Sequence, residues 1–313
     1  MLPLVSLGLW HNFGSVDSYD EAEKMIHSAF DQGVTHFDLA NNYGPEPGSA
    51  ETNFGRIVKE TMAGHRDEMI ISTKAGHDMW PGPYGDGSSR KNLMASIDQS
   101  LKRMQLDYVD IFYSHRYDGV TPVEETMQAL IDIVRQGKAL YVGISKYPAE
   151  LQQKCYDILR EAHVPCLISQ YRASMYDTSA LKANLPVATA NGSGFICFSP
   201  LAQGLLTDRY LNGIPEDSRA AKATGFLQLG DVTPERVEAS RKLKAIAEQR
   251  GQTLPQMALS WLLDQQGVTS VIVGASSVRQ LNSNLAAAEN IAFSADERAA
   301  IAAVLADERL QME

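Results

Sequence analysis

Four titratable residues stand where strand-like runs of the sequence end, and together they could carry out one reaction. Asp38 ends the second such run, Tyr43 follows in the next loop, Lys74 follows the third run and His115 follows the fourth. When parallel strands close into a barrel, their carboxyl ends meet at one rim, where barrel enzymes keep their reactive residues. The spacing therefore predicts that these four side chains converge on one site.

These side chains suit the reduction of a carbonyl group, which needs a hydride from a cofactor and a proton for the developing alkoxide. Free tyrosine has a pKa of about 10, and an adjacent Lys74 ammonium is expected to lower the pKa of Tyr43 by stabilising its phenolate. Asp38 would keep Lys74 charged, and His115 would polarise the carbonyl oxygen through a hydrogen bond. We therefore predict a catalytic set in which Tyr43 donates the proton.

Each of these residues also has a simpler interpretation when taken alone. Asp38 would cap a loop, Tyr43 would pack, Lys74 would be a solvated charge and His115 a structural hydrogen-bonder. Their coincidence on successive strand ends favours catalysis over these separate roles. A different reaction stays open, because barrel aldolases form a Schiff base on a strand-end lysine such as Lys74.

Strand-like and helix-like segments alternate along the chain, and this alternation predicts the scaffold. The strand-like runs are Leu4–Leu7, Thr35–Asp38, Met69–Thr73, Tyr108–Tyr113, Ala139–Ser145, Leu167–Gln170, Gly194–Phe198 and Ser270–Val273. The predicted helices include Ser89–Met104, Val123–Val134, Glu235–Ala247, Leu254–Leu263 and Ala295–Leu305. Such repeats favour an α/β fold, a (β/α)₈ or TIM barrel, in one domain over residues 1–313.

Two edges of this barrel are expected to be unusual. The first predicted strand begins almost at Met1, so the barrel would lack most of an N-terminal hairpin closing its floor. After the seventh strand, a long loop punctuated by Gly and Pro runs from Gly204 to Thr233, and long loops are usually functional or disordered.

Composition narrows the class of partner. The 313 residues carry a net charge of −10, which disfavours nucleic acid and anionic membrane surfaces. Cys155, Cys166 and Cys197 lack the spacing of a redox or metal site, so buried thiols are expected and no metal is predicted. No apolar run is long enough to cross a bilayer. We expect a cytoplasmic protein that acts on a small molecule.

The later strand ends predict a site for a nicotinamide cofactor. Ser145 and Gln170 would read the carboxamide, and Phe198 would stack on the nicotinamide ring. A Gly/Ser turn entering a helix is a phosphate site, and positive side chains in the long loop would clamp the phosphates. These phosphate-binding residues are Gly274, Ser276, Gln280, Asn284, Arg209 and Arg219.

In these stretches the chain resembles the aldo-keto reductases over nearly its full length. The matching motifs are Phe37-Asp38-Leu39-Ala40-Asn41-Asn42-Tyr43-Gly44, Ser72-Thr73-Lys74, Val109-Asp110-Ile111-Phe112-Tyr113-Ser114-His115, Tyr141-Val142-Gly143-Ile144-Ser145 and Phe198-Ser199-Pro200-Leu201. The stretches 7–14, 78–85 and 200–207 are most similar to the group that contains bacterial L-glyceraldehyde 3-phosphate reductases and potassium-channel β subunits.

The resemblance implies NADPH as cofactor, small aldehydes such as glyceraldehyde 3-phosphate and methylglyoxal as substrates, and homo-oligomers, either tetramers or octamers. It adds cofactor contacts from Trp10, Asp38, Ser199, Pro200, Leu201, Gln203 and Gly204, and substrate contacts from Trp10, Tyr43, Trp80, His115 and Arg116. A regulatory NADPH-binding module remains the alternative. The channel subunits tend to carry Asn in place of His115, which favours an enzyme here.

The chain departs from the family pattern beside the predicted cofactor pocket. Ala173 and Ser174 replace a usual Tyr-Asn pair, so the loop after the sixth strand is expected to differ. Lys146 stands where many relatives have Asn, Ser or Arg. Arg116 and Arg90 are candidates to hold a substrate phosphate, although either would also serve as a surface ion-pair partner.

Overall fold

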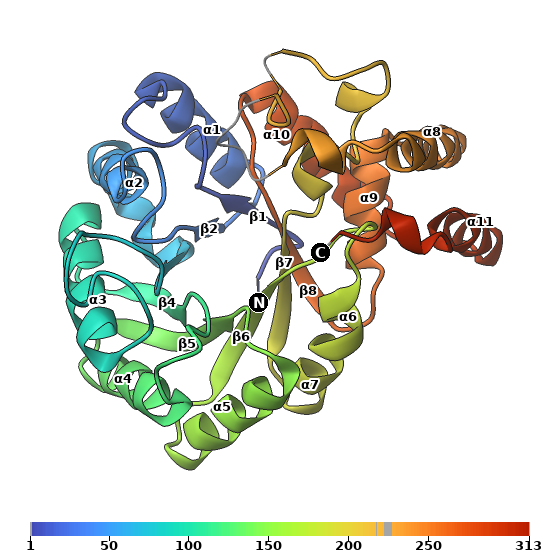
Figure 1. Ribbon diagram of the computed structural model, residues 1–313. Helices are drawn as coiled ribbons and strands as arrows, with labels where there is room; N and C mark the ends of the chain where they lie inside the picture. Colours follow the sequence, from blue (N-terminus) through green and yellow to red (C-terminus); the bar gives the residue numbers. More distant parts are fainter. Residues whose placement is uncertain (1, 217, 222–226, 313) are drawn as a thin grey trace.

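The computed structural model describes residues 2–216, 218–221 and 227–312. Eight parallel strands close into a barrel in which each strand pairs with the next and the last pairs with the first (Figure 1). The strands are β1 (Val5–Gly8), β2 (His36–Asp38), β3 (Ile70–Ala75), β4 (Val109–Ser114), β5 (Ala139–Ser145), β6 (Cys166–Arg172), β7 (Gly194–Phe198) and β8 (Val268–Val273). This is the predicted (β/α)₈ barrel.

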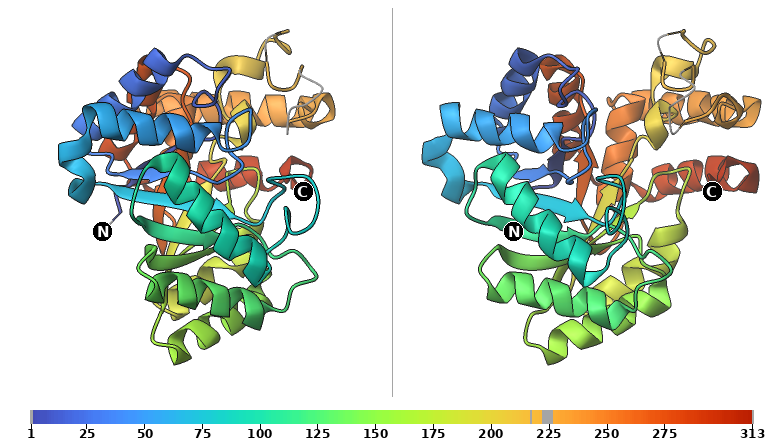
Figure 2. Two further views of the ribbon diagram at one scale, coloured as in Figure 1. Left: turned by 90° about the vertical axis from the view of Figure 1, so that its left-hand side faces the viewer. Right: turned by 60° about the vertical axis from the view of Figure 1, so that its left-hand side comes forward.

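Helices surround the barrel on all sides (Figure 1). They are α1 (Tyr19–Asp31), α2 (Ser49–Thr61), α3 (Arg90–Met104), α4 (Val123–Arg135), α5 (Ala149–Glu161), α6 (Ser179–Ala183), α7 (Leu185–Ala190), α8 (Pro234–Gln249), α9 (Leu254–Leu263), α10 (Val278–Leu285) and α11 (Ala295–Leu305). Short 3₁₀ turns cover Ala63–Glu68, Ala202–Gly204, Asp208–Tyr210, Leu229–Asp231, Ala286–Glu289 and Glu308–Leu310. The side views show the β3–α3 loop projecting from the end of the barrel opposite the N-terminus (Figure 2).

Helix α3 illustrates how the sequence specifies the outer ring. Its apolar positions recur every three or four residues, so Leu93, Ile97 and Met104 are buried on one face. The Ser89 side chain accepts a hydrogen bond from the amide of Asn92 and caps the first turn, which typically contributes about 1 kcal/mol. Gly55 of α2 lets the two helices approach, because a Cβ there would lie 2.3 Å from the carbonyl oxygen of Met104.

The lower part of the barrel is filled by side chains that close it below the rim. Ile111, Tyr113, Ile168, Ile196 and Ile272 form one buried cluster inside the sheet. The ring of Tyr113 lies over Gly143, where a Cβ would stand 2.3 Å from a ring carbon. The barrel is therefore a packed core with an open upper end and not a channel.

Several predicted boundaries needed correction. Strand β3 continues to Ala75, so Lys74 lies inside the strand and does not follow it. Strand β6 is longer at both ends than its apolar run, because polar Arg172 still pairs with Phe198 of β7. Within 204–233 the described residues form short turns, while 217 and 222–226 of that predicted loop lie outside the described residues.

Two other expectations can be compared with the structure. The three cysteines are buried and free, as predicted. Within 2–216, 218–221 and 227–312, no helix combines the length and apolar character that a membrane crossing requires.

Candidate active site

The structure brings the four predicted catalytic residues together at the open end of the barrel. The Nζ atom of Lys74 donates to Asp38 Oδ2 at 2.6 Å and to the carbonyl oxygen of Leu39 at 2.6 Å. The same Nζ lies 5.0 Å from the centre of the Tyr43 ring. The imidazole of His115 meets that ring edge-on, with 5.9 Å between the ring centres. Neighbouring strand ends thus form one compact cluster.

The expected lowering of the Tyr43 pKa is wrong for this structure. Burial, reinforced by the negative charge of Asp38, raises the pKa of the Tyr43 hydroxyl well above its ordinary value. The Lys74 ammonium faces the Tyr43 ring but donates its hydrogen bonds to Asp38 and Leu39. The carboxylate of Asp38 therefore offsets most of the effect of the ammonium charge on the Tyr43 hydroxyl. In this state Tyr43 is therefore firmly protonated.

Burial has matching effects on the other two bases of the cluster. Burial lowers the pKa of Lys74, against the opposing effect of Asp38. Burial and the positive charges of Lys146 and Lys74 lower the pKa of His115 well below its ordinary value, so its imidazole is neutral. A neutral imidazole can still donate a hydrogen bond to a carbonyl oxygen.

A chain of buried hydrogen bonds runs beneath Asp38 through the barrel interior. The hydroxyls of Ser270 and Ser6 are 2.8 Å apart, and Ser6 Oγ lies 2.8 Å from His36 Nδ1. On the other side, His36 Nε2 lies 3.0 Å from Ser72 Oγ, which donates to Asp38 Oδ1 at 2.7 Å. We call Ser270, Ser6, His36, Ser72, Asp38 and Lys74 the buried chain.

The ionised carboxylate sets the direction of every bond in the buried chain. Asp38 only accepts, so Ser72 gives it its proton and must itself accept from His36 Nε2–H. The opposite nitrogen, Nδ1, then accepts from Ser6, whose hydroxyl accepts in turn from Ser270 at 2.8 Å. The carbonyl oxygen of Leu4, 3.2 Å from Ser270 Oγ, is the more distant acceptor for the same proton. Complete burial lowers the pKa of His36 to about 4, which is consistent with this neutral tautomer. Each hydroxyl or ring N–H of the buried chain therefore donates its hydrogen bond in the direction of Asp38.

Of the predicted substrate residues outside the tetrad, Trp10 contacts Tyr43, whereas Arg116 and Trp80 form hydrogen bonds with other residues of the loops. Trp10 stacks against Tyr43 with 5.9 Å between ring centres. Arg116 lies on the rim, where its guanidinium donates to both carboxylate oxygens of Asp86 at 2.7 Å. Trp80 lies in the β3–α3 loop and donates its indole N–H to Pro83. Arg90, at the start of α3, donates to Asp132 of α4 at 2.5 Å, which is the surface ion pair expected as the alternative to a phosphate contact.

Two buried polar atoms, one at the end of β5 and one in α10, have no hydrogen-bond partner in the part of the chain that the structure describes. Ser145 and Gln170 are register partners on β5 and β6, and Gln170 donates to Asp38 Oδ1 at 3.1 Å. Among the described residues, Ser145 Oγ and Asn284 Nδ2 are buried without a hydrogen-bond partner. Buried polar atoms in this condition are rare and costly, so a bound group with its own donors and acceptors fits here.

The loop after β7 has the backbone of a binding loop. Ser199, Ala202 and Gln203 adopt left-handed φ angles of 54°, 47° and 58°, a conformation that costs non-glycine residues free energy and clusters at functional sites. Gln203 donates to Ser199 and accepts from Arg219 at 2.7 Å, so the loop residues predicted to hold the cofactor contact one another. Phe198 ends β7 immediately before them.

The remaining predicted cofactor residues lie at the opening of α10 and in the loops nearby. The Gln280 side chain accepts from the amide and hydroxyl of Ser276, two residues after Gly274 in the turn that follows β8. Pro200, Leu201 and Gly204 belong to the turn after β7, and Arg209 lies in the next 3₁₀ turn. The altered loop after β6 is closed by paired backbone hydrogen bonds between Ser174 and Asp177, with Ala173 buried.

Three residues near the site were not assigned a role from the sequence. His36 precedes Asp38 by two positions, so strand alternation puts both side chains on one face; that spacing was the available signal. His77 and Lys146 are joined by a 2.8 Å hydrogen bond between Lys146 Nζ and His77 Nε2. They come from loops after different strands, and no local pattern predicts that contact.

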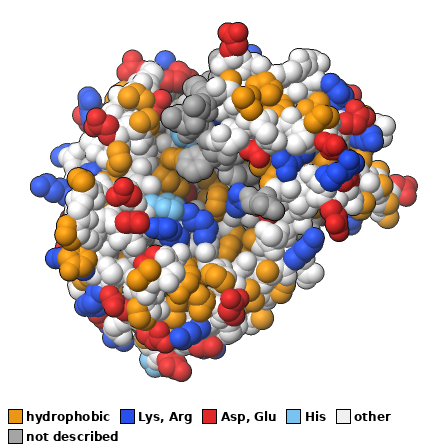
Figure 3. Space-filling model, in the orientation of Figure 1, with side chains coloured by type: hydrophobic (Ala, Val, Ile, Leu, Met, Phe, Trp, Pro, Cys, Tyr) orange, Lys and Arg blue, Asp and Glu red, His pale blue; other side chains and the backbone are white. Residues whose placement is uncertain are grey.

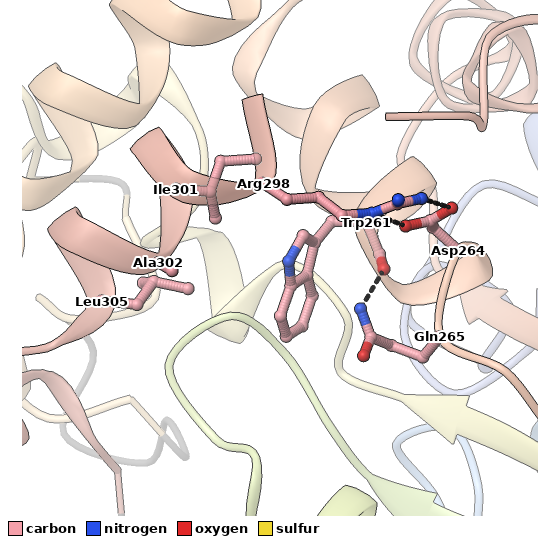
Figure 4. Close-up of a pocket in the computed structure, with 7 residues that line it drawn as sticks. All are labelled: Trp261, Asp264, Gln265, Arg298, Ile301, Ala302 and Leu305. Carbon is pink, nitrogen blue, oxygen red and sulfur yellow. Dashed lines mark hydrogen bonds and ion pairs between the residues drawn. The ribbon is translucent and has the colours of Figure 1, made fainter. Parts of the chain in front are cut away.

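A separate hollow lies among the outer helices, away from this cluster (Figure 4). Trp261, Asp264, Gln265, Arg298, Ile301, Ala302 and Leu305 line it, between α9 and α11. It contains none of the predicted site residues.

A closed eight-stranded barrel with Asp38, Tyr43, Lys74 and His115 together at one end is the arrangement that the resemblance to the aldo-keto reductases predicts. Residues 4–306 match the model of the aldo/keto reductase family, and the chain belongs to that family. It is an oxidoreductase that acts on aldehydes, and members of the family generally use NAD(P)H. Among its relatives are the L-glyceraldehyde 3-phosphate reductases of Escherichia coli O157:H7 and of strain K12. Each is 54% identical over 317 residues, covering 99% of this chain and 91% of the relative.

Proposed function

We propose that this chain reduces small aldehydes, such as glyceraldehyde 3-phosphate or methylglyoxal, to alcohols with NADPH, and that Tyr43 is the general acid. The placement of Tyr43 carries the proposal. Its ring lies 5.0 Å from the Lys74 ammonium and borders the neutral His115 imidazole at the open end of the barrel. The relatives named L-glyceraldehyde 3-phosphate reductase support the choice of substrate.

The protein groups have complementary tasks in this reaction. The raised pKa of Tyr43 keeps its hydroxyl in the donating form. As the carbonyl oxygen gains negative charge it takes that proton, and the Lys74 ammonium stabilises the resulting phenolate. His115 donates a hydrogen bond to the same oxygen without needing to be charged. Because Lys74 Nζ is buried and bonded to two acceptors, it is poorly placed for Schiff-base chemistry.

The unpaired polar atoms support a bound dinucleotide. When bound, NADPH would supply the hydride. Ser145 and Gln170 would hold its carboxamide, Phe198 would cover the nicotinamide ring, and Asn284 and Ser276 would lie near a phosphate. Arg209 and Arg219 would provide the positive charge that distinguishes NADPH from NADH.

Two further parts of the proposal concern the number of subunits in the assembled protein and its location in the cell. We propose a homo-oligomer, either a tetramer or an octamer, located in the cytoplasm. Light scattering coupled to size exclusion measures the subunit number, and cell fractionation measures the location.

The test compares two tyrosines that both face Lys74. Tyr113 places its ring centre 5.6 Å from Lys74 Nζ but is fully buried and packs among isoleucines inside the barrel. Aldehyde-dependent oxidation of NADPH and NADH is followed for wild type, Tyr43→Phe and Tyr113→Phe. Tyr43→Phe should lower kcat by about 1,000-fold or more, the upper range for a general acid, while the Kd for NADPH stays near wild type. Tyr113→Phe should retain most of the turnover.

Undiminished turnover in Tyr43→Phe would overturn the assignment of the acid. NADPH binding without turnover of any aldehyde would instead support a regulatory module.

A further inference from the structure

His36 lies inside the barrel and takes no part in the proton transfer described above. It stands two residues before Asp38 on β2, so both side chains point to the same face of the strand. Figure 3 looks onto the open end of the barrel and shows a hollow at its centre. His36 is fully buried, so it does not touch a substrate that enters there. Any influence on the reaction has to pass through its neighbours.

We propose that His36 is a positioning residue for the reduction of the aldehyde. Acting through the Ser72 hydroxyl, it fixes the orientation of the Asp38 carboxylate and thereby that of the ammonium that faces the proton donor. This inference rests on the proposed function and adds to it a residue that touches neither substrate nor cofactor. It is carried by the contacts on both sides of the imidazole and by the hydrogen bonds that converge on Asp38.

Both oxygens of the Asp38 carboxylate are held by donors from other strands. Oδ2 accepts from Lys74 Nζ at 2.6 Å. Oδ1 accepts from Ser72 Oγ at 2.7 Å and from Gln170 Nε2 at 3.1 Å. A carboxylate that is bonded at both oxygens cannot turn about its last side-chain bond without breaking one of these contacts. Because the Ser72 bond is the shorter of the two at Oδ1, it contributes most to holding Oδ2 toward Lys74.

The Ser72 hydroxyl has one proton, and His36 decides which acceptor receives it. Ser72 Oγ lies 3.0 Å from His36 Nε2 and 2.7 Å from Asp38 Oδ1. The carbonyl oxygen of Phe37 is a third acceptor, 3.5 Å away. If Nε2 were the bare nitrogen of the ring, it would compete with Asp38 for the hydroxyl proton. Because Nε2–H donates instead, Ser72 keeps its proton for the carboxylate, and the two hydrogen bonds polarise each other.

The opposite side of the ring supports the same tautomer. Ser6 Oγ lies 2.8 Å from His36 Nδ1 and 2.8 Å from Ser270 Oγ, and both serines are fully buried. When the Ser6 hydroxyl donates to Nδ1, the single ring proton stays on Nε2. Burial also lowers the pKa of His36 to about 4. A second ring proton, which would turn Nδ1 into a donor, is therefore absent at neutral pH.

The reaction is sensitive to this arrangement because charge develops on Tyr43. As Tyr43 gives up its proton, a phenolate forms whose ring centre lies 5.0 Å from Lys74 Nζ. An ammonium that is already oriented stabilises this charge without reorganisation, whereas a mobile one first has to turn. Hydrogen bonds donated to Asp38 also hold its negative charge away from the tyrosine. Loss of the His36 donor should therefore slow the chemical step and leave the binding of aldehyde and cofactor unchanged.

The test uses two amides that replace opposite nitrogens of the ring. The Gln side chain places its amide nitrogen near the position of Nε2, whereas the shorter Asn side chain reaches only the position of Nδ1. His36→Gln therefore keeps a donor to Ser72, and His36→Asn leaves Ser72 without one. Oxidation of NADPH with glyceraldehyde 3-phosphate or methylglyoxal gives kcat and KM, and fluorescence titration gives the Kd for NADPH.

We expect Ser72→Ala and His36→Asn each to lower kcat by about 10-fold, the lower end of what a hydrogen bond to a charged group contributes. KM for the aldehyde and Kd for NADPH should stay within about twofold of wild type, because only the transition state is affected. His36→Gln should restore kcat to within about threefold of wild type. The double variant, His36→Asn with Ser72→Ala, should fall no more than about twofold below Ser72→Ala, because His36 acts through that hydroxyl.

Ser169→Ala serves as the matched control. Ser169 is a buried serine of β6 whose Oγ lies 2.6 Å from the hydroxyl of Tyr156 on α5. Its replacement removes a hydrogen-bonded hydroxyl from a polar network between the sheet and that helix. Urea unfolding should show comparable losses of stability for Ser169→Ala and Ser72→Ala. Turnover should fall only in Ser72→Ala.

The outcomes separate this inference from the proposed function. If wild type reduces neither aldehyde, the proposed function fails. If wild type is active and His36→Asn keeps kcat within about twofold of it, the positioning role alone is overturned. Equal kcat losses in His36→Gln and His36→Asn, or a similar loss in Ser169→Ala, would assign His36 a structural role only. Additive losses in the double variant, or effects confined to KM or to the Kd for NADPH, would likewise overturn the inference.

Discussion

The buried chain under Asp38 and the proposed cofactor face, which comprises Ser145 on β5, the turn after β7 and Asn284 of α10, are both polar. Their polar groups differ in where their hydrogen-bond partners come from. In the buried chain, each hydroxyl, imidazole and charge has a partner within the fold, ending in the 2.6 Å bond between Lys74 and Asp38. On the cofactor face, Ser145 Oγ and Asn284 Nδ2 are buried without partners among the described residues. Folding alone supplies the hydrogen-bond partners in the buried chain, whereas we propose that a bound cofactor supplies the missing partners on the other face.

The two regions meet two different requirements of the reaction, which are preorganised charges and reversible binding of the cofactor. Charges that stabilise a developing alkoxide act best when they are oriented before the substrate arrives, because no reorganisation is then needed during the reaction. A cofactor that must enter and leave needs groups that are available to it. Binding to such a face also stabilises the folded state by mass action. Substitutions in the two regions should therefore have separable effects on stability and on cofactor affinity.

The largest effect is expected from Asp38→Asn, which removes the carboxylate that is bonded to the buried Lys74. Breaking a buried ion pair typically costs about 3–5 kcal/mol, because one charge is left uncompensated. We expect that loss in urea unfolding at pH 7, and a fall in kcat as Lys74 loses its orientation.

The matched control is Asp264→Asn on the outer helices, where Asp264 pairs with half-exposed Arg298 at 2.7 Å (Figure 4). Ion pairs near the surface contribute about 1 kcal/mol or less. Equal losses in the two variants would contradict the view that the buried chain is special.

A smaller effect is expected from the titration of His36. Burial holds its pKa at about 4 in the folded state, below the ordinary value of about 6.5 that applies to the unfolded chain. As pH falls below 6.5 the unfolded state binds a proton that the folded state refuses, so stability is lost toward pH 4. Between pH 7 and 5 the loss is about 2 kcal/mol. Urea unfolding at both pH values measures it.

The variant that isolates this effect is His36→Gln, which retains an amide donor and acceptor but does not titrate. It should lose about 2 kcal/mol less than wild type between pH 7 and 5, because all other carboxylates and histidines are common to both proteins. A parallel pH dependence in the two proteins would show that His36 is not held neutral.

How far the sequence predicted each region follows from the range of the contacts involved. Strand ends and helical periodicity are local signals, so Asp38, Tyr43, Lys74 and His115 were expected on one rim, and the structure places them there. The direction of the Tyr43 pKa was not predictable, since it depends on how deeply folding buries the hydroxyl and on which group takes the Lys74 hydrogen bonds. Likewise, Lys146 meets His77 across 69 positions of sequence, and only the closed barrel creates that contact.

The sharpest test of the comparison uses two buried serines, one in the middle of β3 and one at the end of β5. Ser72 belongs to the buried chain, where it accepts from His36 and donates to Asp38 at 2.7 Å. Ser145 belongs to the cofactor face and has no hydrogen-bond partner in the part of the chain that the structure describes. Each is replaced by alanine, so the same hydroxyl is removed from each region, and the unfolding free energy and the Kd for NADPH are measured for both variants.

Ser72→Ala should cost on the order of 1.5 kcal/mol of stability, because the donor of His36 is left buried and unpaired, and it should change the Kd for NADPH by less than about twofold. Ser145→Ala should leave stability unchanged or slightly higher, since it removes a hydroxyl that the fold does not satisfy. It should weaken NADPH binding by about fivefold, corresponding to one lost neutral hydrogen bond of about 1 kcal/mol. If Ser145→Ala instead destabilised the free protein as much as Ser72→Ala, its hydroxyl would have an internal role and the two regions would not differ as proposed.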